Sequence, residues 1–151
     1  MGSQDRVSRR VGRVLLVDDE NRVLLLHGFD PADPGRPFWF TVGGGADPGE
    51  SVAEAAAREL REEVGLSVNV RALGQPVWHR LADFGFDGTR YLQEEDYFLL
   101  RVRPFPVSLD GLNQLERDTT DGYRWWDPAE LESSGEDFYP PELPGLLRRL
   151  A

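Results

Sequence analysis

A strand, a glycine triplet and a capped helix follow one another along the chain, and this segment constrains the fold more than any other. Residues 38–42, Phe-Trp-Phe-Thr-Val, have the aromatic and β-branched character of a short strand and run directly into Gly43-Gly44-Gly45. We predict a helix over Ser51–Val64, because its first residue and Glu54 have the spacing of a capping box and Gly65 is a typical terminator. The glycines would let the backbone approach a ligand closely, although a flexible turn is an equal alternative for the triplet alone.

The rest of the chain indicates a mixed α and β domain. Two apolar runs, 10–17 and 22–27, are separated by a polar stretch and predict a hairpin. Further along, we expect a loop over 30–37, strands over 67–77 and 91–102 with a turn at 86–89, and helices over 127–131 and 141–150. Within the helix over 51–64, a core-facing stripe is predicted for Ala53, Ala57, Leu60 and Val64.

Length and composition limit the chemistry. The 151 residues predict a single domain over 1–151, with residues 1–8 as a flexible N-terminus. The absence of cysteine excludes disulfides, thiolate nucleophiles and cysteine-ligated zinc. His27 and His79 are the only imidazoles, and their spacing matches no zinc motif. We therefore expect any bound metal to be a hard ion with oxygen ligands.

The charge balance also excludes classes of partner. Seventeen basic residues against twenty-seven acidic residues give a net charge of −10, which argues against binding of long nucleic acid. No apolar run approaches the roughly 20 residues that span a bilayer, and the N-terminus lacks the apolar stretch of a signal peptide. We therefore expect no membrane partner and a cytoplasmic location.

Three acidic residues of the predicted helix form the main candidate for a metal site. Glu59, Glu62 and Glu63 have i, i+3, i+4 spacing and so share one face. Their mutual repulsion requires compensation, and Arg58 alone cannot neutralise three carboxylates. A solvated surface is the alternative for such a trio. The adjacent glycines favour a divalent cation instead, and Mg²⁺ prefers carboxylates combined with water and phosphate oxygens.

These residues belong to a longer pattern. Gly44, Glu50 and the run Arg58–Leu66 (REL-REE-VGL) occupy every fixed position of G-x5-E-x7-R-E-U-x-E-E-x-G-U, in which U is a bulky aliphatic residue. The chain therefore resembles the Nudix hydrolases, whose signature this is. The order of predicted elements resembles the whole Nudix domain as well.

The resemblance implies a fold and an activity. The implied fold class is α/β (α+β), a Nudix-type α/β/α sandwich with a mixed central β-sheet. The implied activity is Mg²⁺-dependent (or Mn²⁺-dependent) pyrophosphohydrolysis of a nucleoside diphosphate linked to another group. The substrate would be a small nucleotide derivative, including a non-standard or oxidised nucleoside triphosphate. The alternative function is that of a non-catalytic, nucleotide-binding regulatory module. The sequence leaves the oligomeric state open, with a homodimer as one alternative.

The resemblance also implies roles for residues of the motif. Glu59, Glu62 and Glu63 match the metal-binding and catalytic glutamates, and the carbonyl of Gly43 or Gly44 would be a further ligand. Arg58 is a further member of the catalytic set, and with Glu50 it matches a salt bridge that holds the loop against the helix.

A glutamate outside the motif is an additional ligand or general base in many Nudix members. Glu116, in a loop-like stretch before Trp125, is the first candidate here. Glu94, Glu95 and Asp96 are rivals, and a solvated surface acid is the alternative for each.

Candidates for substrate binding lie beside the motif. Gly44 and Gly45 would contact the phosphates, Trp39 could stack on a base, and His79 could contact a phosphate or a base. The alternatives are a core position for Trp39 and a structural role for His79. The identity of the substrate is left open by these residues.

Overall fold

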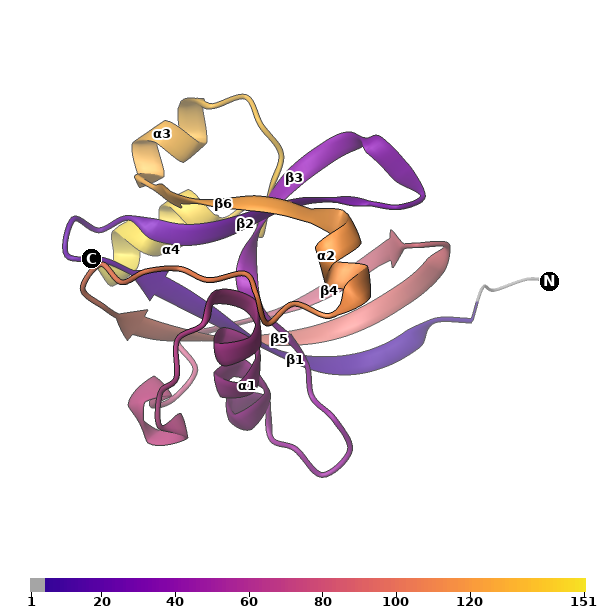
Figure 1. Ribbon diagram of the computed structural model, residues 1–151, viewed down its shortest axis with the longest axis horizontal. Helices are drawn as coiled ribbons and strands as arrows, with labels where there is room; N and C mark the ends of the chain where they lie inside the picture. Colours follow the sequence, from indigo (N-terminus) through magenta and orange to yellow (C-terminus); the bar gives the residue numbers. More distant parts are fainter. Residues whose placement is uncertain (1–4) are drawn as a thin grey trace.

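The computed structural model describes residues 5–151, which form one mixed β-sheet with helices on both faces (Figure 1). The strands are β1 (Val7–Val17), β2 (Val23–Asp30), β3 (Asp33–Gly45), β4 (Trp78–Phe86), β5 (Thr89–Arg101), β6 (Thr120–Trp126) and β7 (Phe138–Tyr139). The helices are α1 (Val52–Val64), the 3₁₀ helix η1 (Val70–Leu73), α2 (Gln114–Thr119), α3 (Pro128–Ser133) and α4 (Leu143–Leu150).

The sheet is mixed and curled. Its strand order is β4-β5-β1-β2-β3-β7, with β6 paired to β2 and an additional pairing between β1 and β3. β1 runs parallel to β5, and β3 runs parallel to β7, whereas the remaining pairs are antiparallel. This arrangement confirms the expected mixed central sheet.

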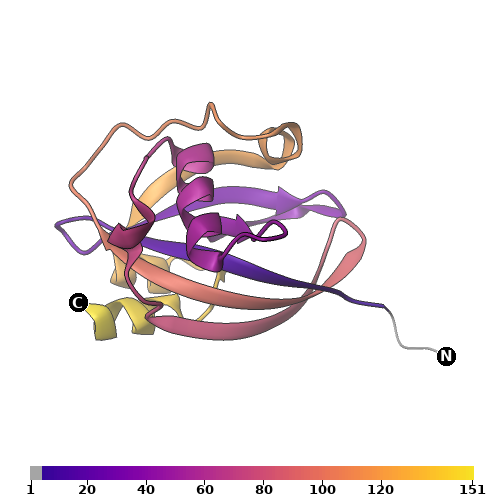
Figure 2. The same ribbon diagram turned by 90° about the horizontal axis from the view of Figure 1, so that it is seen from below.

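Two apolar cores lie on the two faces of the sheet. Alternate side chains of β1 divide between them, since Val14 and Leu16 pack toward α1 while Leu15 and Val17 pack toward α3 and α4. Figure 2 shows α1 on one side of the sheet and α4 on the other. The expected α/β/α layering is therefore confirmed.

The position of α1 depends on a glycine in β1. A Cβ atom at Gly12 would lie 2.1 Å from the carbonyl oxygen of Val52, so only glycine lets the first turn of the helix approach the strand this closely. The helix itself has the predicted ends, with Ser51 and Glu54 forming a capping box and Gly65 in the left-handed conformation. These local signals fix where α1 begins and ends.

Several other expectations are also confirmed. β1 and β2 form the predicted hairpin, and Asp87 and Gly88 turn the chain between β4 and β5 with positive φ. Asp127 caps α3, which has proline in its first turn. The C-terminal helix begins at Leu143, two residues later than predicted, and buries Leu143, Leu146 and Leu147.

Other expectations were wrong. The segment 30–37 is not a loop, because β3 already begins at Asp33, and the two prolines of that part occupy exposed positions at the start of a strand, where a missing N–H is tolerated. The segment 67–77 is not a strand but contains η1, because the Asn69 side chain accepts a hydrogen bond from Arg71 N and Gly74 ends the turn. The strand β6 was not predicted.

The N-terminal expectation divides into two parts. Val7 and Ser8 belong to β1, where they pair with Tyr91 and Leu92. The prediction of a flexible N-terminus over 1–8 is therefore wrong for these two residues. Residues 1–4 lie outside the described part of the chain.

Candidate metal-binding site

Two of the predicted acids are buried where α1 meets the end of β3. Glu59 is 9% exposed and Glu63 is 4% exposed, and both lie beside the glycine triplet. The backbone N–H of Gly43 donates to Glu63 Oε1 at 2.7 Å, and Arg58 Nη1 donates to Glu59 Oε1 at 2.8 Å. The burial was not predicted: α1 buries Ala55 and Ala56 in addition to most of the expected stripe, so its acidic face lies inside the fold.

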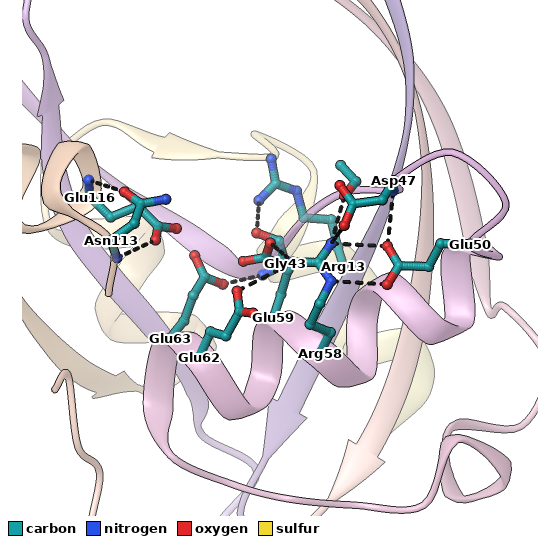
Figure 3. Close-up of polar contacts among 11 residues, drawn as sticks. Arg13, Gly43, Asp47, Glu50, Arg58, Glu59, Glu62, Glu63, Asn113 and Glu116 are labelled. Carbon is teal, nitrogen blue, oxygen red and sulfur yellow. Dashed lines mark hydrogen bonds and ion pairs between the residues drawn. The ribbon is translucent and has the colours of Figure 1, made fainter. Parts of the chain in front are cut away.

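Glu116 completes the group. Glu59, Glu63 and Glu116 each offer a carboxylate oxygen, and these three atoms lie within 4.8 Å of one another. Figure 3 shows Glu116 opposite Glu63, across the space between α2 and α1. Glu116 was expected in a loop, but it lies in the first turn of α2. Its position is set by the long connection after β5, which returns the chain to the C-terminal end of α1.

Glu62 is close to this group but not part of it. Its Oε2 atom accepts from Arg58 Nη1 at 3.3 Å, and its side chain is 38% exposed. Arg58 therefore joins Glu62 to Glu59 through one guanidinium nitrogen. The structure thus separates the predicted trio into two buried acids and one half-exposed acid.

The electrostatics of the group favour binding of positive charge. Burial, followed by the nearby Glu116 carboxylate, raises the pKa of Glu59 to about 7. Burial also raises the pKa of Glu63 well above its ordinary value, and Glu59 adds to this effect. Each ionised carboxylate therefore disfavours the ionisation of its neighbours, which a bound cation would relieve.

Arg58 and Glu50 form the predicted bridge between loop and helix. Arg58 Nε donates to Glu50 Oε2 at 2.9 Å, and Nη2 donates to Glu50 Oε1 at 3.0 Å. The same Nη2 atom also donates to the carbonyl oxygen of Gly45 at 3.0 Å. Hydrogen bonding to Glu50, followed by that to Glu59, raises the pKa of Arg58, so this guanidinium stays charged. One side chain thus holds the end of β3, the loop and an acid of the buried group (Figure 3).

The glycine triplet provides space rather than flexibility. It forms the last residues of β3, so the alternative of a flexible turn is wrong. A Cβ atom at Gly44 would lie 2.7 Å from the carboxylate carbon of Glu59. Gly43 has φ = +144°, and a Cβ atom there would lie 2.3 Å from the carbonyl oxygen of Gly12. Gly43 therefore leaves no room for a side chain, and a side chain at Gly44 would displace the Glu59 carboxylate.

Arg13 is a residue of this region that the sequence did not reveal. Its Nη1 atom donates to the carbonyl oxygens of Thr41 and Gly43, at 3.3 and 3.2 Å. The Gly43 oxygen, which was expected as a metal ligand, therefore already accepts a hydrogen bond from a cation. Arg13 in turn forms an ion pair of 3.7 Å with the buried Glu95.

The rivals of Glu116 lie elsewhere. Glu95 forms ion pairs with Arg13 and Arg80 and accepts a hydrogen bond from the Tyr97 hydroxyl, so its negative charge is already compensated. Glu94 is exposed, and Asp96 Oδ1 lies 2.7 Å from Nδ1 of His79. The alternation along β5 indicates that Glu95 faces inward. Its cationic partners Arg13 and Arg80 come from β1 and β4, so the pattern of β5 alone could not identify them.

The two side chains expected to contact a nucleoside do not touch the acidic group. Trp39 packs on Trp126 in the core on the α3 and α4 side of the sheet, and its indole nitrogen donates to Glu136. His79 is on β4, where it contacts Asp96. The contacts of Trp39 therefore fit the alternative of a core position, and those of His79 fit the alternative of a structural role.

Comparison with known proteins identifies the family. The profile of the NUDIX domain matches residues 8–147. The chain belongs to the Nudix hydrolases. An RNA pyrophosphohydrolase from Erythrobacter litoralis (strain HTCC2594) is 30% identical over 85% of this chain and 81% of its own length. A putative 8-oxo-dGTP diphosphatase from Bacillus subtilis (strain 168) is 37% identical over 78% of this chain and 66% of its own length.

The fold of this Nudix hydrolase is also found among solved structures. The dihydroneopterin triphosphate pyrophosphohydrolase of E. coli superposes with a TM-score of 0.64 at 20% identity, over 95% of this chain and 97% of that chain. The Nudix relatives are named as pyrophosphohydrolases and diphosphatases, so this protein is a hydrolase acting on phosphoanhydride bonds.

The residues present fit the cofactor of the family. Nudix hydrolases generally use divalent metal ions. In this Nudix chain the donor set of Glu59, Glu63 and Glu116 consists only of carboxylate oxygens, which hard divalent cations prefer. None of the helices within residues 5–151 combines the length and the apolar composition of a transmembrane span.

Proposed function

We propose that this protein is a Mg²⁺-dependent pyrophosphohydrolase that cleaves a nucleoside diphosphate linked to another group, with Mn²⁺ as a substitute ion. The observation that carries the proposal is the convergence of Glu59, Glu63 and Glu116 within 4.8 Å beside the glycine-rich end of β3. Mg²⁺ takes few ligands from a protein and completes its shell with water and substrate phosphate oxygens. A three-carboxylate site that borders bare backbone suits that preference.

Each residue of the site has a proposed part. Glu59, Glu63 and Glu116 hold the metal, and Glu62 is a further acid beside Arg58. When bound, the metal ion neutralises charge on the phosphate oxygens and lowers the pKa of water. Arg58 keeps Glu59 in place. Gly43 supplies a carbonyl ligand only through the lone pair that Arg13 leaves free, while Gly44 and Gly45 let the phosphates approach the backbone.

The reaction requires no covalent intermediate. A water oxygen forms a bond to phosphorus, and the bridging P–O bond breaks with its electron pair going to the leaving phosphate. The proton of the attacking water passes to a carboxylate of the site. This scheme is consistent with a chain that lacks cysteine.

The proposed substrate is a small nucleotide derivative, including a non-standard or oxidised nucleoside triphosphate. The names of the relatives support this class, because one refers to 8-oxo-dGTP and one to dihydroneopterin triphosphate. Another refers to RNA, which makes an RNA 5′ end a competing substrate. Trp39 and His79 carry no part of this proposal, because Trp39 packs in the core on the α3 and α4 side of the sheet and His79 contacts Asp96. We also propose that residues 1–151 work as one domain, because the family match covers 8–147.

The experiment is a hydrolysis screen on the full chain. It uses nucleoside triphosphates, 8-oxo-dGTP, dihydroneopterin triphosphate, nucleotide sugars, dinucleotides, ADP-ribose and a 5′-triphosphate RNA oligonucleotide, each with Mg²⁺ and with EDTA. We expect turnover of a small nucleotide that EDTA abolishes and Mg²⁺ restores. Glu63→Gln should lower kcat by about 100-fold or more, because it removes a charge from the site.

Glu20→Gln is the matched control, since it removes an exposed acid at the turn between β1 and β2 that pairs with Arg22 and is not part of the acidic group. Binding of nucleotides without turnover across the panel would favour the regulatory module instead. Unchanged kcat in Glu63→Gln would contradict the proposed role of the acidic group.

A further inference from the structure

Two short helices of this protein begin with the same capping arrangement. In α2, the Asn113 side chain accepts from Glu116 N at 2.9 Å, and Asn113 N donates to Glu116 Oε1 at 3.0 Å. In α3, Asp127 and Glu130 form the corresponding pair of hydrogen bonds. Both helices have six residues. Only in α2 does the third helical residue also belong to the acidic group.

The cap is the main local determinant of α2. A helix of six residues is too short to be stable through its own backbone hydrogen bonds, because nucleation is unfavourable. Capping side chains satisfy N–H groups that the first turn leaves without a partner. The orientation of Glu116 therefore depends on the first turn of α2, which in turn depends on Asn113.

The surrounding contacts fix the position of this turn relative to α1. Ser108 N donates to the carbonyl oxygen of Val64, at the last residue of α1. A Cβ atom at Gly111 would lie 2.5 Å from the carbonyl oxygen of Glu62, so the connection lies directly on the helix that carries the other acids. Arg117 donates to the carbonyl oxygens of Asp110 and Leu112, which closes the connection onto α2.

The far end of α2 is also held. Thr119 is buried, and a Cβ atom at Gly28 would lie 2.3 Å from the carbonyl oxygen of Thr119, so α2 ends directly against β2. The connection before α2 and the end of α2 are thus held by contacts with α1 and β2. Both hydrogen bonds of the cap act at the first turn of α2 (Figure 3).

We propose that Asn113 is a positioning residue for the metal site: its cap fixes the first turn of α2 and its backbone N–H orients the Glu116 carboxylate toward Glu59 and Glu63. This inference rests on the proposed function, because it assumes that the three acids bind a divalent cation. Asn113 touches neither metal nor substrate and acts through Glu116.

The test compares four variants of the full chain with the wild type. Asn113→Ala removes the oxygen that caps α2. Asn113→Ser retains an uncharged capping oxygen, of the kind that Ser51 provides at the start of α1. Asp127→Ala removes the same kind of cap from α3 and serves as the matched control. Glu63→Gln reports on the metal site itself. The readouts are calorimetric titration with MgCl₂ and with MnCl₂, thermal unfolding in EDTA, and kcat measured over a range of Mg²⁺ concentrations.

We expect Asn113→Ala to weaken Mg²⁺ binding by roughly 10-fold, as the loss of an outer-shell partner of a metal ligand commonly does. The Mg²⁺ concentration for half-maximal activity should rise by the same factor, while kcat at saturating Mg²⁺ stays within about twofold of wild type. Asn113→Ser should restore the wild-type affinity. Asp127→Ala should lower the unfolding temperature in EDTA but leave Mg²⁺ affinity unchanged.

Equal Mg²⁺ affinities in Asn113→Ala and Asp127→Ala would overturn this inference, and so would a failure of Asn113→Ser to restore binding. If Glu63→Gln weakens Mg²⁺ binding while Asn113→Ala does not, only the positioning role fails. If Mg²⁺ binding to the wild type is absent or is unaffected by Glu63→Gln, the proposed function fails with it.

Discussion

Gly44 lies where the last residues of β3 meet the Glu59 side chain, and it has no room for a methyl group. An added Cβ atom would lie within 3.0 Å of three atoms of the Glu59 side chain. Since these atoms belong to a side chain, the fold can accommodate alanine by moving the carboxylate. The steric requirement at this position therefore concerns the site more than the stability of the fold.

We predict that Gly44→Ala lowers kcat by about 10- to 100-fold with little loss of stability, because a displacement of about 1 Å at a catalytic group has an effect of this order. Steady-state kinetics and a thermal melt check this. Gly35→Ala is the control, since a Cβ atom there meets nothing within 4 Å. Wild-type kinetics for Gly44→Ala would show that the Glu59 carboxylate tolerates displacement.

For single residues of the site, the sequence indicated which side chains take part but not how each is buried or which distant residues it contacts. The spacing of Glu59, Glu62 and Glu63 indicated a shared helix face, and the Arg58 bridge to Glu50 is confirmed. The burial of two of the three acids could not be predicted, because it depends on how α1 packs against β3. Arg13 also gave no signal, since its partners come from β3 and β5.

Among the elements, the loop between β3 and α1 depends on one ion pair. Arg58 bonds Glu50 through two nitrogens, and these hydrogen bonds lower the pKa of Glu50 below its ordinary value of 4.5. A carboxyl group with a lowered pKa in the folded state stabilises the protein above the unfolded-state value. That contribution is lost as the pH falls through the folded-state pKa.

Glu50→Gln should therefore lower the free energy of unfolding by about 1 kcal/mol at neutral pH, and the difference from wild type should shrink below about pH 4. Urea titrations at the two pH values measure this. Glu132→Gln removes a similar two-nitrogen pair with Arg148 whose side chains are 56% and 50% exposed, compared with 17% and 22% for Glu50 and Arg58. We expect a smaller loss there, and a pH-independent difference for Glu50→Gln would refute the linkage.

α1, α3 and the turn between β4 and β5 were predicted from local signals, whereas β6 was not predicted. Capping residues marked α1 and α3, and Asp87-Gly88 marked a turn, because these hydrogen bonds and φ values arise within a few residues. β6 was missed because its pairing with β2 connects residues about one hundred positions apart in the chain, as Leu25↔Arg124 shows. The capping box of α2 was equally visible in the sequence, as Asn113 and Glu116, and would have placed Glu116 on a helix.

For the molecule as a whole, the metal links the site to global stability. A ligand that binds only the folded state raises the free energy of unfolding by about 2.7 kcal/mol when its concentration is one hundred times its dissociation constant. For a chain of this length that corresponds to a rise in Tm of roughly 5–10 °C.

We predict such a rise when MgCl₂ is added to protein treated with EDTA, measured by calorimetry. In the double variant Glu59→Gln and Glu63→Gln the rise should disappear, because two of the three donors lose their charge. An equal rise in wild type and double variant would indicate that Mg²⁺ stabilises the protein at another location.

The fold class could be predicted because the Nudix signature constrains a whole domain, while the curl of the sheet could not. β1 pairs with β2, β3 and β5, and these three pairings have no common sequence signal. The two cores on either side of the sheet follow from the continuous apolar run Val14–Val17 of β1, because successive side chains of a strand point to opposite faces.

The parallel pairing of β1 with β5 has a consequence for biosynthesis. The partners of Val7–Val17 are Tyr91–Arg101, and Arg9 and Gln93 are 84 positions apart. β1 is synthesised before β5, so one of its edges stays without a partner until the 84 further positions that separate Arg9 from Gln93 have been translated. Long-range pairing of this kind slows folding and lengthens the time in which an open edge can associate with another nascent chain.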